Sequence, residues 1–344
     1  MQLIKSDINI DFIGKQKIGF VMSLILIIAS AVSLIAHGGP NYGIDFAGGT
    51  LIQVKFENNV PITQVRSALD ELKLKDVSVQ NFGEAGAHEF LIRTSSSQEV
   101  ENGLGEAVTT ALRAKTDSNP LIRRVEMVGP QVGDDLKNKA LLAIFYSLLF
   151  ITIYISGRFE MKWVLSGVTA GALMTAVYFL SVFNLSMTYF IAGALVVSLA
   201  LFWSLRLKYA MGAIVALVHD VFITVGIFSL LNLDFSLSII AALLTIIGYS
   251  LNDTIIVFDR IRENVKSADD KDVLPSLFNK SINETLSRTL LTSVTTLIVL
   301  LALFFLGGDI IHNFAFAMII GVLIGTYSSI FIASPVVLAA HQKG

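Results

Sequence analysis

Eight apolar stretches, each close to the thickness of a bilayer, constrain the fold of this chain more than any other feature. They lie at residues 18–36, 138–156, 163–183, 188–205, 209–231, 236–258, 289–306 and 314–340. A hydrocarbon core of about 30 Å is crossed by roughly 20 helical residues. Charged residues are only 15% of the 344, against about 25% in soluble domains. The sequence therefore predicts a polytopic α-helical membrane protein with about eight spans.

The charged residues are unevenly distributed, and their distribution predicts a second domain. Residues 40–137 hold 24 of the 52 charged side chains, whereas residues 163–205 hold none. Within the polar region, apolar periodicity and turn residues predict strands near 51–56, 77–82, 89–94 and 121–128, and helices after Pro61 and after Ser96 or Ser97. The order β-α-β-β-α-β predicts a ferredoxin-like α+β domain over residues 38–137.

Lysines and arginines in the short loops predict the orientation of the chain. One set of loops holds Arg158, Lys162, Arg206, Lys208 and a basic group from Arg260 to Arg288, while the loops near 184–187, 232–235 and 307–311 hold none. With an even number of spans, both termini are expected in the cytoplasm and the domain at 38–137 outside. Residues 1–37 then form a cytosolic N-terminus and an uncleaved first span. Residues 138–344 form the bundle, with a charged cytosolic loop at 259–288. At the start of this loop, Asp259, Arg260, Arg262 and Glu263 read as a continuation of the preceding helix out of the membrane.

No residue set in the chain points to an enzyme or to a cofactor. The chain has no cysteine, which removes disulfides and thiolate metal sites. His88 reads as a solvated loop residue, and Gly48-Gly49 lacks the lysine and helix of a phosphate-binding loop. The net charge of −2 gives no field that would attract nucleic acid. A binding or coupling role is therefore favoured, with no metal and no cofactor.

The few polar residues inside the apolar stretches are the candidate functional residues, because ionisable groups in spans are costly and mark function by default. Asp253 is expected to load and release a proton. Arg288 lies at the beginning of a later span and is expected to influence the charge state of Asp253 electrostatically. Asp220 is a second candidate for a proton-relay residue. Asn252, His219, Ser250 and Tyr249 are supporting polar residues on the same two spans.

Structural roles compete with these functional ones. Asn252 and His219 can simply hydrogen-bond between helices, and Asp220 can form a structural pair with His219. Arg288 also fits a cationic residue at the membrane interface. Asp234 and Asp309 are expected in outer loops, without a special role.

Five motifs resemble those of the SecD/SecF family of bacterial protein-export proteins, and most closely its SecF branch. They are GIDFAGGT at 43–50, VGPQVG at 128–133, GYSLNDT at 248–254, VFDRIREN at 257–264 and SINETLSRT at 281–289. The family glycine motifs comprise Gly43, Asp45, Gly48, Gly49, Gly129, Pro130 and Gly133. The likeness covers residues 1–157 and 206–340.

The resemblance implies a fold similar to half of an RND-type transporter and a place in the plasma membrane. It implies a SecD-like partner, work beside the SecYEG channel, and use of proton flow to pull an emerging polypeptide outward. In these motifs Asp253 matches the proton-linked aspartate of the family and Arg288 its functional arginine. A further carboxylate of the relay would come from the SecD-like partner.

The chain departs from this family in one respect, since the family has six spans. The excess lies at residues 158–205, which align weakly with the following segment at an offset of 48 residues. A duplicated helical hairpin is one explanation, and an unrelated two-helix insertion is the other. Two extra helices preserve the topology. They would either pack at the lipid-facing edge of the bundle or block the usual interface with the SecD-like partner.

Three other functions are weaker alternatives. A self-contained proton-driven exporter of small molecules would need a substrate cavity and more than two intramembrane carboxylates. A scaffold without transport predicts that Asp253 tolerates Asn. An intramembrane protease is disfavoured, because it would need a serine–base pair or two facing aspartates.

Overall fold

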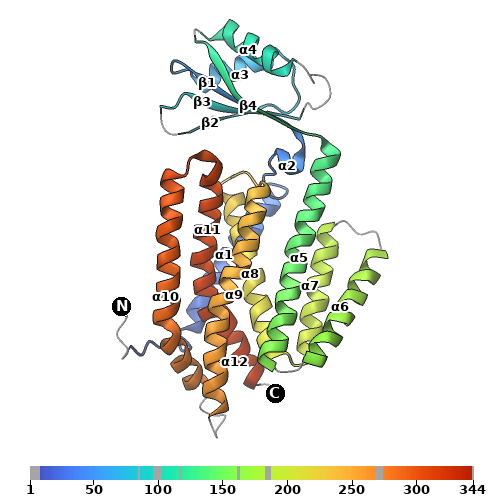
Figure 1. Cartoon of the computed structure of the whole chain (residues 1–344), viewed down its shortest axis with the longest axis vertical. Helices are drawn as coiled ribbons and strands as arrows, with labels where there is room; N and C mark the ends of the chain where they lie inside the picture. Colours follow the sequence, from blue (N-terminus) through green and yellow to red (C-terminus); the bar gives the residue numbers. More distant parts are fainter. Residues whose placement is uncertain are drawn as a thin grey trace.

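The computed structural model describes residues 8–83, 86–95, 103–116, 118–160, 163–182, 187–267 and 274–342. It has two parts, a small sheet domain at one end and a long helical bundle below it (Figure 1). The C-terminal helix lies at the end of the bundle opposite the sheet domain. This end is called the distal end, and the end below the sheet domain the proximal end.

The sheet domain contains the strands and helices in the predicted order. They are β1 (Gly49–Phe56), α3 (Ile62–Asp70), β2 (Ser78–Phe82), β3 (Glu89–Thr94), α4 (Leu104–Lys115) and β4 (Pro120–Val128). The strands form an antiparallel sheet in the order β2-β3-β1-β4. Alternate residues such as Ile52, Val54 and Ile92 are buried, because successive side chains of a strand point to opposite faces. They pack with Val65 of α3 and Val108 of α4.

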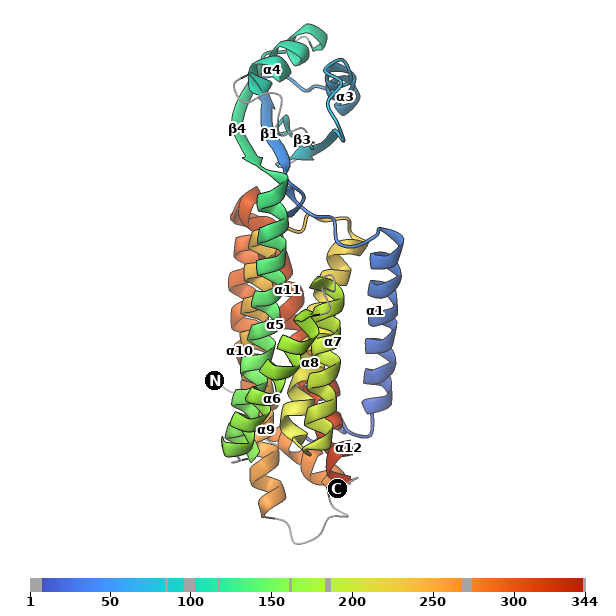
Figure 2. The same cartoon turned by 90° about the vertical axis from the view of Figure 1, so that its right-hand side faces the viewer.

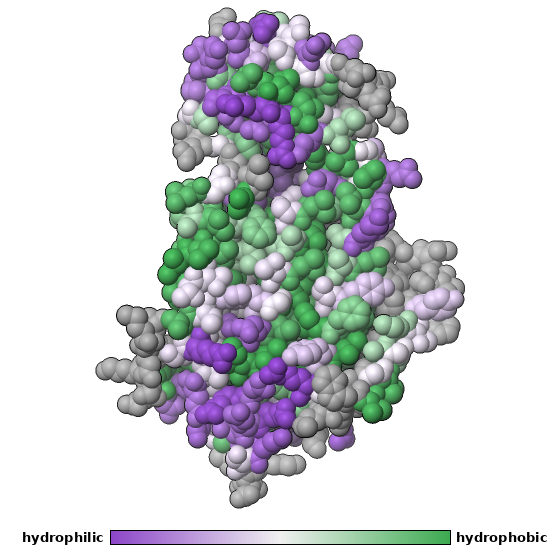
Figure 3. All heavy atoms as spheres, viewed as in Figure 1, coloured by the Kyte–Doolittle hydropathy of each residue, from purple (hydrophilic) through white to green (hydrophobic). Residues whose placement is uncertain are grey.

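Six helices in the described part of the chain are long and apolar enough to cross a membrane. They comprise α1 (Gln16–Ala36), α5 (Pro130–Glu160), α8 (Lys208–Leu230), α9 (Leu237–Lys266), α10 (Leu274–Leu306) and α11 (Asp309–Ser328), the last continuing through a π-helical turn (Ser329–Ala333) into α12 (Ser334–Gln342). Hydrophobic residues cover the middle of the bundle, while hydrophilic residues gather on the sheet domain and at the distal end (Figure 3). This distribution is typical of a membrane protein.

The two remaining apolar stretches are also helical and lie at the edge of the bundle. They form α6 (Trp163–Val182, 20 residues) and α7 (Met187–Ser204, 18 residues). Both stand beside α5, and α7 also contacts α8 (Figure 1). The segment thus lies at the edge of the bundle. Eight spans were expected, and six helices among the described residues meet the length and apolarity of a span.

Two expected boundaries differ from the structure. Helix α5 begins at Pro130, directly after β4 ends at Val128, so the sheet domain ends about two helical turns before residue 137. Proline fits the first turn of a helix because its missing N–H has no intrahelical partner there. The expected loop at 259–288 is mostly the ends of α9 and α10, because apolar residues such as Phe258, Ile261 and Phe278 continue a buried stripe there.

Small residues bring two pairs of helices in the bundle unusually close together. A Cβ on Gly321 of α11 would lie 2.2 Å from Ile246 of α9, and a Cβ on Gly325 would lie 2.8 Å from Ser250. On the other side of the bundle, a Cβ on Gly226 of α8 would lie 2.0 Å from Ser30 of α1. Helices in a membrane associate through such close contacts. Polar side chains in the centre are therefore held at short range.

Candidate functional site

Asp220 of α8 is a fully buried carboxylate whose two oxygens are both hydrogen-bonded. His219 Nδ1 lies 2.9 Å from Oδ1, while the hydroxyls of Ser250 and Ser328 donate to Oδ2 over 2.6 and 2.8 Å. Its exposed fraction is 0%. These contacts tie α8 to α9 and to the end of α11. The structural pairing of His219 with Asp220, one of the alternatives from the sequence, is present.

His219 continues this network toward the first helix. Its Nε2 lies 3.0 Å from the hydroxyl of Ser23 in α1, and Ser23 lies 3.0 Å from the hydroxyl of Tyr327. The Tyr327 hydroxyl donates to the carbonyl of Gly19 over 2.5 Å. An unbroken chain of polar groups therefore runs from Asp220 to α1.

Asp253 of α9 is the second buried carboxylate, and its contacts are much weaker. Its exposed fraction is 1%. Oδ2 lies 3.5 Å from the hydroxyls of Ser293 in α10 and of Thr326 in α11, which lie 2.6 Å from each other. Oδ1 is buried and has no hydrogen-bond partner among the described residues. Buried polar atoms without a partner are rare in proteins and are expected where a site binds water or a proton.

A row of hydroxyls on α10 leads to Asp253 from the distal end. Thr285, Thr289 and Ser293 are buried and four residues apart, so they lie on one face of the helix. The Thr289 hydroxyl is buried without a partner among the described residues, like Asp253 Oδ1. By helical rise, the row is about 12 Å long.

Thr285 lines an open polar hollow between α5, α9 and α10. The hollow has a volume of about 690 Å³, and Asn252 and Arg288 also line it. Arg288 is exposed and forms no ion pair with any described residue. The residues expected to support the site therefore lie in different places. Asn252 lines the hollow, and Ser250 donates to Asp220. Tyr249 donates to Thr296 over 3.2 Å.

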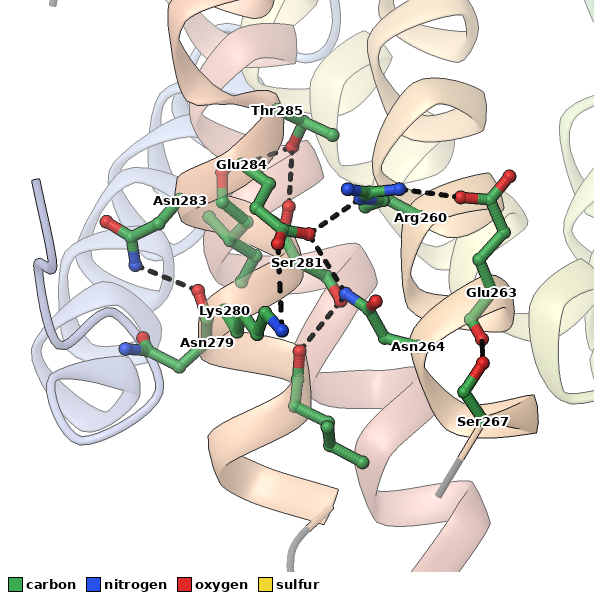
Figure 4. Close-up of polar contacts among 12 residues, drawn as sticks. Arg260, Glu263, Asn264, Ser267, Asn279, Lys280, Ser281, Asn283, Glu284 and Thr285 are labelled. Atoms are coloured by element: carbon green, nitrogen blue, oxygen red, sulfur yellow. Dashed lines mark hydrogen bonds and ion pairs between the residues drawn. The ribbon is translucent and has the colours of Figure 1, made fainter. Parts of the chain in front are cut away.

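The rim of this hollow is a cluster of ion pairs that joins the distal ends of α9 and α10. Arg260 lies between two carboxylates, 2.6 Å from Glu284 and 2.9 Å from Glu263 (Figure 4). Asn264 donates to Ser281 and to Glu284 over 2.8 and 3.1 Å. These contacts hold the distal end of α9, the helix that carries Asp253, to the distal end of α10.

The two family glycine motifs meet between the sheet domain and the bundle. A short helix, α2 (Ile44–Ala47), follows Gly43 and packs against α5. Gly48 has φ +71°, and a Cβ there would lie 2.8 Å from the Cα of Pro130. A Cβ on Gly133 would lie 2.8 Å from the carbonyl of Phe46. Glycine is required at these positions by the close approach of two backbones.

The first glycine motif also holds the beginning of α9. Asp45 Oδ2 accepts a 2.9 Å hydrogen bond from the N–H of Leu237, the first residue of α9. An acidic group at this position is favourable, because the first N–H groups of a helix lack intrahelical partners and carry partial positive charge. Gly43 donates to the carbonyl of Phe235 over 2.9 Å. The motif is thus attached to the helix that carries Asp253.

An ion pair between Arg93 and Asp234 joins the sheet itself to the same loop. Arg93 lies on β3, on the face opposite Ile92 and the two helices, and it reaches Asp234 between α8 and α9. Asn41 also donates to Asp234 over 3.2 Å. Burial lowers the pKa of the Arg93 guanidinium from its ordinary value, and the nearby Asp45 charge opposes this shift. The expectation that Asp234 has no special role is wrong.

Breaking this pair is expected to loosen the sheet domain from the bundle. Arg93→Asp or Asp234→Arg should each cost about 1–3 kcal/mol at the junction, below the roughly 3–5 kcal/mol of a fully buried pair. Both side chains keep some exposure, 15% and 19%. Hydrogen exchange of β3 and of the first turn of α9 in the full-length protein measures the effect. The double variant should recover part of the protection, whereas additive losses would show that the pair is not coupled.

His219 and Ser250, which hold Asp220, were expected from the sequence as supporting residues, but other residues that hold the two carboxylates were not identified from it. Ser328, Thr326 and Ser23 lie far from Asp220 and Asp253 along the chain, in segments that read as ordinary apolar spans. Their only signal is the presence of serine and threonine in those spans. Among the described residues, no group of three or more His, Asp or Glu could hold a metal ion.

Comparison with known proteins places this arrangement in a family. The family model described as protein export membrane protein SecD/SecF, C-terminal, matches residues 108–199 and 186–343, and the SecD/SecF GG motif matches residues 33–60. A protein from Calditerrivibrio nitroreducens named protein translocase subunit SecF is 42% identical, with 98% of this chain and 96% of the relative covered. One of the same name from Magnetococcus marinus is 44% identical, with 98% and 94% covered.

A solved structure is similar over nearly the whole chain. The crystal structure of SecDF from Thermus thermophilus, described as a translocon-associated membrane protein, matches with a TM-score of 0.70 and 32% identity. The match covers 98% of this chain and 39% of the SecDF chain, so this chain spans about two fifths of that protein. Together with the family models and the relatives, this similarity shows that the chain belongs to the SecD/SecF family of protein-export membrane proteins.

Proposed function

We propose that this chain is an auxiliary subunit of the protein translocase, linked to the proton-motive force, which assists export of polypeptides across the bacterial plasma membrane. It would act with a SecD-like partner and beside the SecYEG channel. Membership of the SecD/SecF family and the relatives named protein translocase subunit SecF support the translocase role. The observation that supports proton coupling is Asp253, a buried carboxylate with one oxygen unpaired among the described residues.

The proposed topology has both termini in the cytoplasm and eight spans, with α6 and α7 as an added hairpin. The family model matches in two pieces that overlap at residues 186–199, which supports duplication over an unrelated insertion. The domain at 38–137 would lie outside and contact the SecD-like partner or the emerging polypeptide. Its element order and its strand order β2-β3-β1-β4 support a ferredoxin-like fold.

The proton would enter from the cytoplasm through the polar hollow. Arg288 and Asn252 would face arriving water there, and the hydroxyls of Thr285, Thr289 and Ser293 would lead from the hollow to Asp253. An ionised carboxylate at that depth is costly without a charged partner. Loading and release of a proton would therefore change how tightly α9, α10 and α11 pack. Asp220, paired with His219, would be the second carboxylate of the relay.

The junction with the sheet domain gives a route from the proton to the outside. Asp253 and the capped first residue of α9 lie on one helix, and Asp45 and Arg93 connect that end to the sheet domain. A small rotation or shift of α9 would then move the sheet domain relative to the membrane. Packed helices can transmit such shifts because close-packed interfaces have discrete arrangements.

Removing the central hydroxyl of the row is expected to slow proton delivery without unfolding the bundle. Thr289→Val keeps the shape of the side chain and removes only the hydroxyl, whose oxygen already lacks a partner among the described residues. The gradient-dependent part of export should fall. Thr295→Val is the control, because Thr295 is an exposed residue of the same helix that bonds only to its own helix. Equal export by both variants would remove the row from the proton path.

Complementation tests the proposed function. Cells that lack their own SecF-like subunit are supplied with this chain and its SecD-like partner, and release of a secreted protein is followed with and without a proton gradient. Restored export that weakens when the gradient collapses is expected. No restoration of export, together with gradient-dependent efflux of small molecules, would instead identify an RND-like exporter.

A further inference from the structure

An apolar groove runs along the proximal half of the bundle, between α5, α8 and α9. Its volume is about 230 Å³, and apolar side chains such as Ile144, Leu148, Val221 and Leu243 form most of its wall. Lys137 is the one charged residue that lines it among the described residues, and it lies at the end nearest the sheet domain. A water molecule would be poorly stabilised in such a cavity, because buried water needs two to four polar hydrogen-bond partners.

The length of the groove matches one leaflet of a bilayer. On α5 its lining extends from Lys137 to Leu148, which is about 16 Å at the rise of an α-helix. Half of a hydrocarbon core of about 30 Å is about 15 Å. A groove of this length would reach from the headgroup level of the proximal leaflet to near the middle of the membrane.

The charge at the mouth of the groove is available to an anion. Lys137 Nζ lies 4.2 Å from the centre of the Tyr42 ring, and Lys137 forms no ion pair with a described carboxylate. By contrast Lys139, two residues further along, is paired with Asp135 at 2.7 Å. An ammonium over an aromatic ring is held in place and still has donors free for a phosphate oxygen.

We propose that the groove binds one acyl chain of an anionic phospholipid from the proximal leaflet, with its phosphate at Lys137. The shape and apolar wall fit a hydrocarbon chain, and the cation complements the headgroup charge. A phospholipid is favoured over a helix of another protein, because a volume of about 230 Å³ is far too small for a helix about 10 Å across, and because the single charge lies at the end nearest the sheet domain.

This site gives the added hairpin a role. Leu195 of α7 lines the groove together with α5 and α8, so the hairpin contributes to the wall that would hold the acyl chain. At the mouth, Tyr42, Phe46 and Phe235 belong to the junction with the sheet domain. At the other end, Val218 directly precedes His219. A bound chain would therefore support the packing of α5 against α8 from the junction to the polar centre.

Native mass spectrometry of the full-length protein tests the proposal. The protein is purified with its SecD-like partner from vesicles of phosphatidylglycerol and phosphatidylcholine in equal amounts, and the lipid retained per complex is counted. Preferential retention of phosphatidylglycerol is expected, reduced about fivefold in Lys137→Ala, since one lysine contributes about that factor to anionic lipid binding. Lys139→Ala should retain as much as the unmodified protein.

Two further variants test whether the lipid binds in the groove. Val225→Phe fills the groove and should reduce retention of both lipids, while a photoreactive side chain in place of Leu141 should crosslink to a lipid carrying a long acyl chain. Equal retention of both lipids, or equal retention by the Lys137 and Lys139 variants, would overturn the proposal. A crosslink from position 141 to the SecD-like partner in place of lipid would overturn it as well.

Discussion

Asp253→Asn is expected to remove the gradient-driven part of export while the protein stays in the membrane at normal levels. Asparagine has nearly the same shape as aspartate and can still accept from Ser293 and Thr326, which lie 3.5 Å from Oδ2. It cannot take up or release a proton. The packing of α9, α10 and α11 should therefore persist, whereas any change of packing driven by protonation should be lost.

The expected effect is large because each proton carries substantial energy. One elementary charge crossing 100 mV corresponds to about 2.3 kcal/mol, which is roughly a fiftyfold factor in an equilibrium. Export assisted by even one proton per step should thus fall toward the level seen with a collapsed gradient. Release of a secreted protein, followed with and without an uncoupler, measures this difference.

Asp135→Asn is the matched control for this substitution. Asp135 is an exposed carboxylate on α5, and its ion pair with Lys139 is of the kind that contributes little. It should export normally and respond normally to the gradient. An Asp253→Asn protein that behaves in the same way would exclude Asp253 as the coupling residue and favour a scaffold.

Asp220→Ala is expected to destabilise the bundle more than any other single truncation of a polar residue in it. The change removes the acceptor for three groups, His219, Ser250 and Ser328. Hydrogen bonds between membrane helices contribute about 0.6 kcal/mol on average and at most about 1.7. Two such bonds, from Ser250 and Ser328, are lost together with the His219 contact inside α8. The predicted cost is about 1–4 kcal/mol, which thermal unfolding of the purified protein would measure.

Asp220→Asn separates the structural role of this residue from its proposed place in the relay. An amide can accept from one neighbour and donate to a reoriented serine hydroxyl, so most of the stability should return. As a member of the relay, the variant should still lose part of the gradient response. Normal stability with a normal gradient response would leave Asp220 with a structural role only, and a cost of Asp220→Ala below 1 kcal/mol would contradict the network.

Much of the architecture could be predicted from the sequence because it depends on local patterns. The long apolar stretches predict helices in an apolar environment. The alternation of apolar and polar residues in 51–56 and 89–94 predicts strands with one buried face. The boundary at Pro130 was missed because the polar residues after it resemble a linker, although they form the first turns of α5. The continuation of α9 beyond Asp259 was expected, whereas the beginning of α10 was missed for a similar reason, since many charges mask a narrow buried stripe.

The candidate site could be predicted only in part, because its contacts join distant segments. Asp253 and Asp220 stand out as acids among apolar residues, and Arg288 as a cation. Whether an acid is satisfied depends on partners such as Thr326 and Ser328, whose positions follow from how α11 packs against α9. The pairing of Arg93 with Asp234 likewise required the register of β3 and the position of the sheet above the bundle (Figure 2).

The junction and the polar centre have different chemistry for different tasks. At the junction, Asp45, Arg93 and Asp234 form fixed contacts, which suit transmission of movement between two bodies. At Asp253, long contacts and an oxygen unpaired among the described residues suit a group that changes its protonation state. The first residue of α9 contacts the junction through Asp45, and Asp253 lies near the middle of the same helix.

A pH-difference infrared spectrum would show whether Asp253 takes up and releases a proton. The full-length protein, with its SecD-like partner, is placed in bilayers, and the carboxyl C=O band is compared between two pH values. We predict a band from a buried carboxyl that changes with pH, is absent from Asp253→Asn and is retained in Asp135→Asn. Identical spectra for the unmodified protein and Asp253→Asn would mean that Asp253 does not exchange a proton, and would contradict the account.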